Sequence, residues 1–390
     1  MSTIPVTIRY ADLVDSVAAA LQYISYYHPA DYIAHLARAY AAEQSPAAKD
    51  AIAQILTNSK MCAEGRRPIC QDTGIVNVFL KIGMDVRFSG FDGSIEDAVN
   101  EGVRRAYNFA DNKLRASIVA DPHFERKNTK DNTPAVIHMT VIPGNTVDVQ
   151  VAAKGGGSEN KTKFVMMNPS DSLVDWVMKT VPTMGAGWCP PGMLGIGIGG
   201  TAERAMLLAK QSLMEDIDMY ELKARGPRDK IEELRIELCD KINALGIGAQ
   251  GLGGLTTVLD VKIATYPTHA ASKPVAMIPN CAATRHAHFV LDGSGHRLIG
   301  VLQTLQMPAL RAAIAHLDHR ALVELPLQVD QVHHRVGVLN AGLHTPQGRR
   351  CGQDPRAGRS REEVAEAEIG NVRIGEPSHS SGHAAVEVKA

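Results

Sequence analysis

Residues 134–154 read PAVIHMTVIPGNTVDVQVAAK, two apolar-rich runs on either side of Pro-Gly-Asn. Runs of this composition are typical of β-strands, and Pro-Gly-Asn favours a tight turn. The stretch therefore predicts a β-hairpin. Upstream, VNVFLKIGMDVRF at 76–88 alternates apolar and polar residues, which predicts a further strand.

Segments with helical spacing surround these strands. Apolar residues recur at intervals of three and four through 10–57 and through 94–110, where Ser94 is the expected N-cap. Three later segments share the pattern: LVDWVMKTV (173–181), TAERAMLLAKQSLMEDI (201–217) and RDKIEELRIELCDKINAL (228–245). The sequence predicts a mixed α/β (α+β) fold with helices around a mostly antiparallel sheet, joined by long glycine-rich loops.

Composition excludes several classes of protein. The chain has 390 residues, with 41 basic and 42 acidic side chains, so charge gives no reason to expect binding to nucleic acid or to an anionic membrane. No apolar run reaches the roughly 18 to 20 residues that a membrane span needs. The N-terminus lacks the basic start and apolar core of a signal peptide. We therefore expect a cytoplasmic protein.

The composition changes near Gly295. From 296 to 390 there is no Phe, Tyr or Trp, the only lysine is Lys389, and more than half of the histidines lie in this quarter. The sequence predicts one domain at 1–295 and an atypical tail at 296–390. A shifted reading frame in GC-rich DNA is one hypothesis for this tail, and a genuine linker or disordered extension is the other.

Six cysteines are scattered along the chain, without a C-x-x-C pair, which is too sparse for a disulfide framework. Cys239 fits core packing in a helix, Cys62 is ambiguous, and Cys351 belongs to the tail. The other three lie in loops rich in Pro, Gly and polar residues: RRPICQDTG (66–74), GWCPPG (187–192) and YPTHAASKPVAMIPNCAATRHAH (266–288). Packing explains a cysteine in such a loop poorly, so a metal-binding role is the alternative.

Three thiolates have a specific chemical meaning when they bind an iron–sulfur cluster. A cubane held by four cysteines is closed and suits electron transfer. With three, one iron keeps an open position and can polarise a hydroxyl or carboxylate as a Lewis acid. Such a centre suits the addition or removal of water on a hydroxy acid.

Several long motifs resemble the class I, iron–sulfur-dependent fumarate hydratases and the related L-tartrate dehydratase alpha subunits. They occur in order from the N-terminus to about Gly295: RRPICQDTG, RKNTKDNTPAVIH (126–138), KGGGSENK (154–161), MGAGWCPPGMLGIGIGGTAE (184–203), GLGGLTTVLDVKIATYPTHAASKPVA (251–276) and NCAATRH (280–286). The resemblance implies a lyase of the tricarboxylic acid cycle type that hydrates fumarate to malate reversibly.

The resemblance also implies roles for individual residues. Cys70, Cys189 and Cys281 would hold a 4Fe–4S cluster with one open iron. Asp72 would have an acid–base role beside it, and His269 would line the substrate site. The substrate carboxylates would be bound by Arg115, by Lys273 and by the backbone amides of Gly155, Gly156 and Gly157. Arg285 and His286 are weaker candidates for the same role.

The family's second domain, with a threonine base in a Gly-Pro-Thr-Thr motif, has no counterpart in residues 296–390. We therefore expect either a homodimer or a complex with a separate beta subunit, acting on a small dicarboxylate. Three rival hypotheses stay open: an L-tartrate dehydratase alpha subunit, a catalytically dead cluster-binding remnant, and a zinc hydrolase that uses Cys and His ligands.

Overall fold

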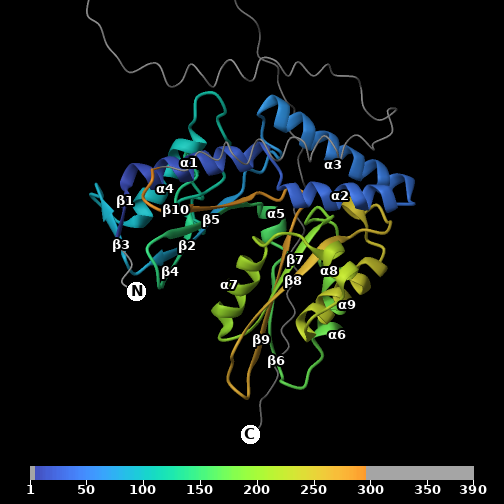
Figure 1. The fold of residues 1–390 in the computed structure, drawn as a ribbon. Helices are drawn as coiled ribbons and strands as arrows, with labels where there is room; N and C mark the ends of the chain where they lie inside the picture. The colour runs from blue at the N-terminus through green and yellow to red at the C-terminus, as the bar shows by residue number, and fades with distance from the viewer. Residues whose placement is uncertain (1–4, 296–390) are drawn as a thin grey trace, which may run out of the picture. The chain divides into compact units, whose positions relative to one another are not determined.

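The structure is a computed structural model that describes residues 5–295, which all belong to one compact unit. Groups of helices and groups of strands follow one another along the chain (Figure 1). This confirms the mixed α/β prediction. The predicted tail at 296–390 lies outside the described residues. Among residues 5–295, no helix combines the length and apolarity that crossing a membrane requires.

Nine α-helices occur in the described part of the chain. Their bounds are α1 Tyr10–Tyr26, α2 Ala30–Ala42, α3 Pro46–Gly65, α4 Ile95–Tyr107, α5 Gly156–Glu159, α6 Leu173–Met184, α7 Ala202–Ser212, α8 Met219–Arg225 and α9 Lys230–Ala244, with a 3-10 turn, η1, at Ala249–Gly251. The N-cap prediction at Ser94 is confirmed: its hydroxyl accepts from Asp97 N–H at 3.1 Å, and the Asp97 carboxylate accepts from Ser94 N–H at 2.8 Å.

Within residues 5–295, ten strands form three sheets. The strands are β1 Val6–Arg9, β2 Ile75–Gly83, β3 Val86–Ser89, β4 Val136–Ile142, β5 Val147–Lys154, β6 Lys163–Met167, β7 Gly192–Gly199, β8 Val258–Tyr266, β9 Lys273–Asn280 and β10 His286–Leu291. The first four-stranded sheet has the order β10-β5-β2-β4, the second has β6-β9-β7-β8, and β1 pairs with β3. Each large sheet has two antiparallel pairs and one parallel pair, and the β1–β3 pair is parallel.

The hairpin predicted at 134–154 is wrong. Strands β4 and β5 form where expected, but β2 lies between them, parallel to β4 and antiparallel to β5. The 143–146 turn crosses the end of β2, where Asp85 N–H donates to Gly144 O at 2.9 Å. Because β2 is apolar and buried along most of its length, it takes the central position, and β4 is left at the sheet edge.

Each large sheet has its own core. Helices α1 and α4 pack on the first sheet, where Val17, Val99 and Val149 are fully buried. Helices α6 and α9 cover one face of the second sheet around Trp188, and α7 covers the other (Figure 1). Cys239 is buried on α9, and burial raises its pKa to about 12, which agrees with the packing role predicted for it.

Glycines on β7 allow α7 to approach the second sheet closely. An ideal Cβ on Gly195 would lie 2.2 Å from Ala209 O, and one on Gly197 would lie 2.0 Å from Ala205 O. The GIGIGGT sequence at 195–201 is therefore a strand end followed by a helix start, and two of its glycines have a packing role.

We expect Gly197→Ala to destabilise the fold by about 1 to 3 kcal/mol, because α7 must move away from β7 to admit the methyl group. Urea denaturation measures this change. Gly65→Ala is the matched control, because the nearest atoms to its new Cβ belong to the Arg67 side chain at 3.6 Å, and alanine suits a helix end better than glycine. Equal stability of the two variants would contradict the close-packing account.

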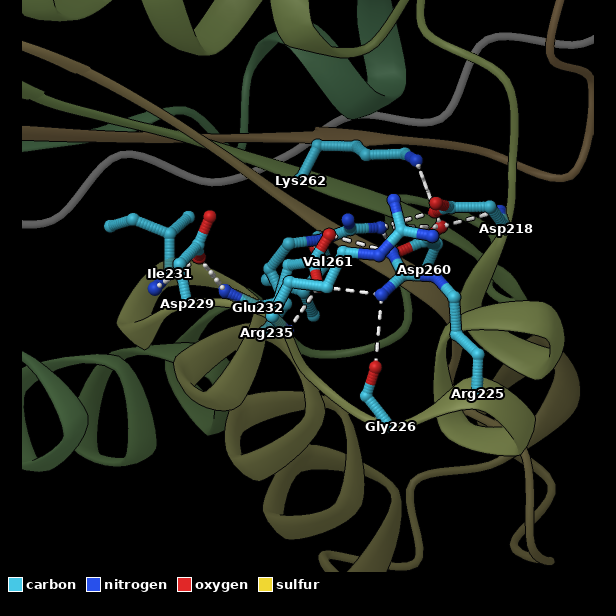
Figure 2. Close-up of polar contacts among 11 residues, drawn as sticks. Asp218, Arg225, Gly226, Asp229, Ile231, Glu232, Arg235, Asp260, Val261 and Lys262 are labelled. Carbon is cyan, nitrogen blue, oxygen red and sulfur yellow. Dashed lines mark hydrogen bonds and ion pairs between the residues drawn. The ribbon is translucent and has the colours of Figure 1, made fainter.

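A charge-balanced cluster ties α9 and the segment before α8 to β8 (Figure 2). Asp260 on β8 is fully buried and lies 3.0 Å from Arg235 Nη2 and 3.2 Å from Lys262 Nζ. Asp218 pairs with both cations, at 2.6 Å from Lys262 Nζ. The Arg235 Nε–H also donates to Val261 O at 2.8 Å. Asp260, Arg235 and Lys262 are buried, and the partly exposed Asp218 supplies the second acid that balances the two cations.

Candidate metal centre

Strand register brings two of the three cysteine loops together. Strands β7 and β9 are antiparallel neighbours, with Met193 opposite Asn280. Cys189 precedes β7 and Cys281 follows β9, so both lie at the same end of the second sheet. The Ala282 N–H donates to Cys189 O at 2.9 Å and joins the two loops directly.

Local hydrogen bonds shape the turn after β9. The Asn280 carbonyl Oδ1 accepts from Cys281 N–H at 3.2 Å, and Asn280 Nδ2 donates to Thr284 Oγ1 at 2.7 Å. Cys189 has φ +56°, a left-handed conformation that L-residues adopt at a cost of about 1 to 2 kcal/mol. Such conformations cluster at ligand-binding sites, since the surrounding structure must hold them in place.

The first cysteine loop is anchored by helices α1 and α3. Ile69 N–H donates to Ser25 O at 2.8 Å, and Asn58 Nδ2 donates to Ile69 O at 2.9 Å. Cys62, ambiguous in sequence, is buried against Ile69 on α3, and burial raises its pKa. It therefore packs under the loop that carries Cys70.

Arg285 links this first loop to the turn after β9. Its Nη1 donates to Asp72 O at 2.7 Å. With the bond between Ala282 and Cys189, the turn at 281–285 contacts both of the other cysteine loops. Segments that are more than 200 residues apart in sequence thus meet at one place.

The three thiols influence one another electrostatically. Burial is the largest cause that raises the pKa of the Cys189 thiol, and the neighbouring thiolates of Cys281 and Cys70 raise it further. Cys189 is exposed, Cys70 is half-buried and Cys281 is 9% exposed. Between residues 5 and 295, no group of three His, Cys, Asp or Glu side chains is close enough to bind a single metal ion. The thiolates of a cubane bind three separate irons and stand further apart than the ligands of one ion.

Asp72 is held by backbone amides beside these thiols. Its Oδ1 accepts from Gly74 N–H at 3.0 Å, and its Oδ2 accepts from Gly156 N–H at 2.7 Å. The predicted carboxylate-binding amide of Gly156 is thus engaged by Asp72 in this structure.

Gly155 leaves a space that three functional groups surround. An ideal Cβ at this position would lie 3.3 Å from Asp72 Oδ2, 3.8 Å from Arg285 Nη2 and 3.9 Å from Cys281 Sγ. An ideal Cβ on Gly157 would lie 3.3 Å from Gly187 O, in the Cys189 loop. The glycine triplet therefore borders all three cysteine loops.

Arg115 lies next to the first cysteine loop. Its backbone carbonyl accepts a hydrogen bond from Thr73 Oγ1, and its side chain is exposed. Tyr107 supports the same loop, because its hydroxyl donates to Thr73 O at 2.9 Å. This position allows the Arg115 guanidinium to reach a ligand from the solvent side.

Two predicted residues are not brought to this place. Lys273 begins β9 and Cys281 follows the strand, which puts Lys273 about 25 Å away at 3.3 Å per residue, and His269 lies in the loop before that far end. Lys273 Nζ donates to Asp171 O and supports the turn before α6. His269 is exposed, and its Nδ1 accepts from Ala271 N–H at 3.1 Å. Neither side chain belongs to the cysteine site of the same chain.

The sequence analysis did not single out Lys154. It is 5% exposed at the end of β5, its Nζ donates to Ser158 Oγ, and the same Nζ lies 3.6 Å from Oε2 of the Glu159 carboxylate. Burial lowers its pKa to about 8, and the charges of Glu159 and Cys281 oppose that shift. A lysine that ends an apolar strand directly before three glycines was the available signal.

The residues fit an iron–sulfur cluster by the chemistry of the donor set. Three soft thiolate donors on separate loops suit iron–sulfur binding, and an acidic side chain stands beside them. The buried Nε and Nη2 of Arg285 have no hydrogen-bond partner within the described residues. Unsatisfied cationic donors next to three thiols are what an anionic group would complement.

Comparison with known proteins shows the family of the chain. The family described as "Fumarate hydratase (Fumerase)" matches residues 14–290. A protein of Methanocaldococcus jannaschii named "Putative L(+)-tartrate dehydratase subunit alpha" is 38% identical over 70% of this chain and 95% of its own length. The L(+)-tartrate dehydratase subunit alpha of Escherichia coli (strain K12) is 28% identical over 73% of this chain and 94% of its own. The chain therefore belongs to the fumarate hydratase (fumerase) family and is a hydro-lyase.

Proposed function

We propose that this chain is the cluster-binding part of an enzyme that reversibly hydrates fumarate to malate. The observation that supports this proposal best is the convergence of Cys70, Cys189 and Cys281 beside Asp72. The bound group would be a 4Fe–4S cluster held by these three thiolates. When bound, it would supply an open iron that acts as a Lewis acid on the substrate hydroxyl.

Asp72 is proposed to exchange a proton with the substrate. Each of its carboxylate oxygens accepts one amide hydrogen bond, from Gly74 and from Gly156, so each keeps further acceptor capacity for a substrate hydroxyl or water. The two amides fix the orientation of the carboxylate. Arg115 would bind a substrate carboxylate through its guanidinium fork.

We further propose that a second subunit completes the site. Both compared relatives are named as alpha subunits, and their lengths are almost fully covered by the match to this chain. The Gly-Pro-Thr-Thr motif expected of the second domain does not occur at 296–390. Proton transfer and electrostatic stabilisation each contribute orders of magnitude in rate, so we expect little turnover from this chain alone.

L-tartrate is the second candidate substrate, because the relatives carry that activity in their names. It is also a four-carbon dicarboxylate with a hydroxyl group to remove. The same three cysteines and Asp72 would serve either substrate, so the choice between them would depend on the groups that bind the far end of the molecule.

The test uses the full chain, reconstituted with iron and sulfide without oxygen and mixed with a candidate beta subunit. Values of kcat/KM on malate, fumarate and L-tartrate rank the substrates. Asp72→Asn is expected to keep its cluster spectrum and lose about 10²- to 10⁴-fold in kcat. Asp148→Asn is the matched control, since that carboxylate pairs with His288 on the surface. Turnover of Asp72→Asn near the wild-type rate would contradict the proposed role.

A further inference from the structure

Two buried cations lie under the cysteine loops. Arg285 is 3% exposed and Lys154 is 5% exposed. Within residues 5–295, Nη1 is the one guanidinium nitrogen of Arg285 that has a hydrogen-bond partner, and this partner is the uncharged backbone carbonyl oxygen of Asp72. A buried charge is costly unless a partner of opposite charge compensates it.

The cations face a small cavity between the two large sheets. Its volume is about 10 Å³, close to the space of one water molecule. It is lined from the first sheet by Asn77, Lys154 and His286, from α7 by Lys210, and from the turn after β9 by Arg285. Arg285 is thus too enclosed to meet a dicarboxylate from solvent.

Ion pairing compensates these cations only in part. Glu159 is shared, at 3.6 Å from Lys154 Nζ and in contact with Lys210. The charges of Asp31 and Asp216 act on His286. The Asp72 carboxylate lies near Arg285 across the space beside Gly155, but its two oxygens accept hydrogen bonds from backbone amides. Among the described residues, Arg285 is therefore left without an ion-pair partner, and it lies next to Cys281.

We propose that Arg285 and Lys154 are positioning residues, which offset the negative charge of the three thiolates and their cluster while Arg285 holds the Asp72 loop in place. This inference rests on the proposed cluster. Three thiolates give the bound group a net negative charge, and nearby positive charge stabilises it and raises its reduction potential. Outer-shell partners of this kind also orient the ligands themselves.

Charge and hydrogen bonding can be separated at Arg285. Arg285→Gln removes the charge and is expected to lower the reduction potential of the cluster and to speed the loss of iron to a chelator by about 10- to 100-fold. Arg285→Lys keeps the charge but loses the guanidinium fork, so the reduction potential of the cluster should stay near that of the wild type. The value of kcat should fall, because the loop that carries Asp72 loses its hydrogen bond from Arg285. Lys154→Met should lower the potential as Arg285→Gln does.

Arg204→Gln is the matched control. That arginine also has a buried Nε without a partner, but it stacks on Tyr266 at the far end of β7. Circular dichroism checks that each variant folds, and Lys154→Met decides the matter if Arg285→Gln fails to fold. Wild-type potential and iron retention in Lys154→Met and in folded Arg285→Gln would overturn the inference alone. Failure of the wild-type chain to bind a cluster would overturn the proposed function together with it.

Discussion

Cys281→Ser is expected to abolish the brown absorbance of the reconstituted chain and to leave iron and sulfide well below the wild-type content. Cys281 follows β9 at the turn that contacts both other cysteine loops, and its thiol is the most buried of the three. A serine hydroxyl there is a hard, weakly acidic donor that replaces a soft thiolate. Optical absorbance, iron and acid-labile sulfide measure the loss.

Cys70→Ser and Cys189→Ser are expected to behave in the same way. Cys62→Ser is the control, because Cys62 lies next to the Cys70 loop but is buried under it, with its Sγ 3.5 Å from Pro68 O. It should cost some stability and leave the cluster in place. A full cluster in any one of the three ligand variants would refute that ligand assignment.

Asp260→Asn is expected to reduce the free energy of unfolding by about 3 to 5 kcal/mol, because it removes the buried acid and leaves the buried Arg235 and Lys262 with only the partly exposed Asp218. Urea denaturation measures the change. Glu237→Gln breaks the exposed pair with Lys241 and should cost no more than about 0.5 kcal/mol. Similar losses in the two variants would contradict the account of a buried network.

The same network gives a direction for pH dependence. Burial alone would raise the pKa of Asp218, but hydrogen bonds from Arg235 and Lys262 outweigh it and hold this pKa below its usual range. A carboxyl group whose pKa is lowered in the folded state stabilises the fold at any pH above the pKa that the group has in the unfolded chain, which is about 3.9. That contribution is lost as the pH falls below this value.

Local features of the fold could be predicted from the sequence, and long-range pairing could not. The capping box at Ser94 involves residues three apart, so the motif alone predicts it. The 134–154 turn is local as well, but β2, which separates β4 from β5, comes about 60 residues earlier. No pattern within the turn indicates that a third strand is inserted between its two arms.

The site shows the same division. Cys70, Cys189 and Cys281 could be selected because each lies in a loop where packing explains a cysteine poorly. His269 and Lys273 share a continuous motif with Cys281, yet β9 runs between them and carries them to opposite ends of the sheet. The burial of Lys154 and Arg285 arises only when the two sheets come together, and sequence spacing does not report it.

Iron and acid-labile sulfide analysis of the anaerobically reconstituted wild-type chain tests the central claim most directly. The account predicts about four irons and four sulfides per chain, as expected for a cubane cluster. Zinc in place of iron, or iron without sulfide, would contradict it.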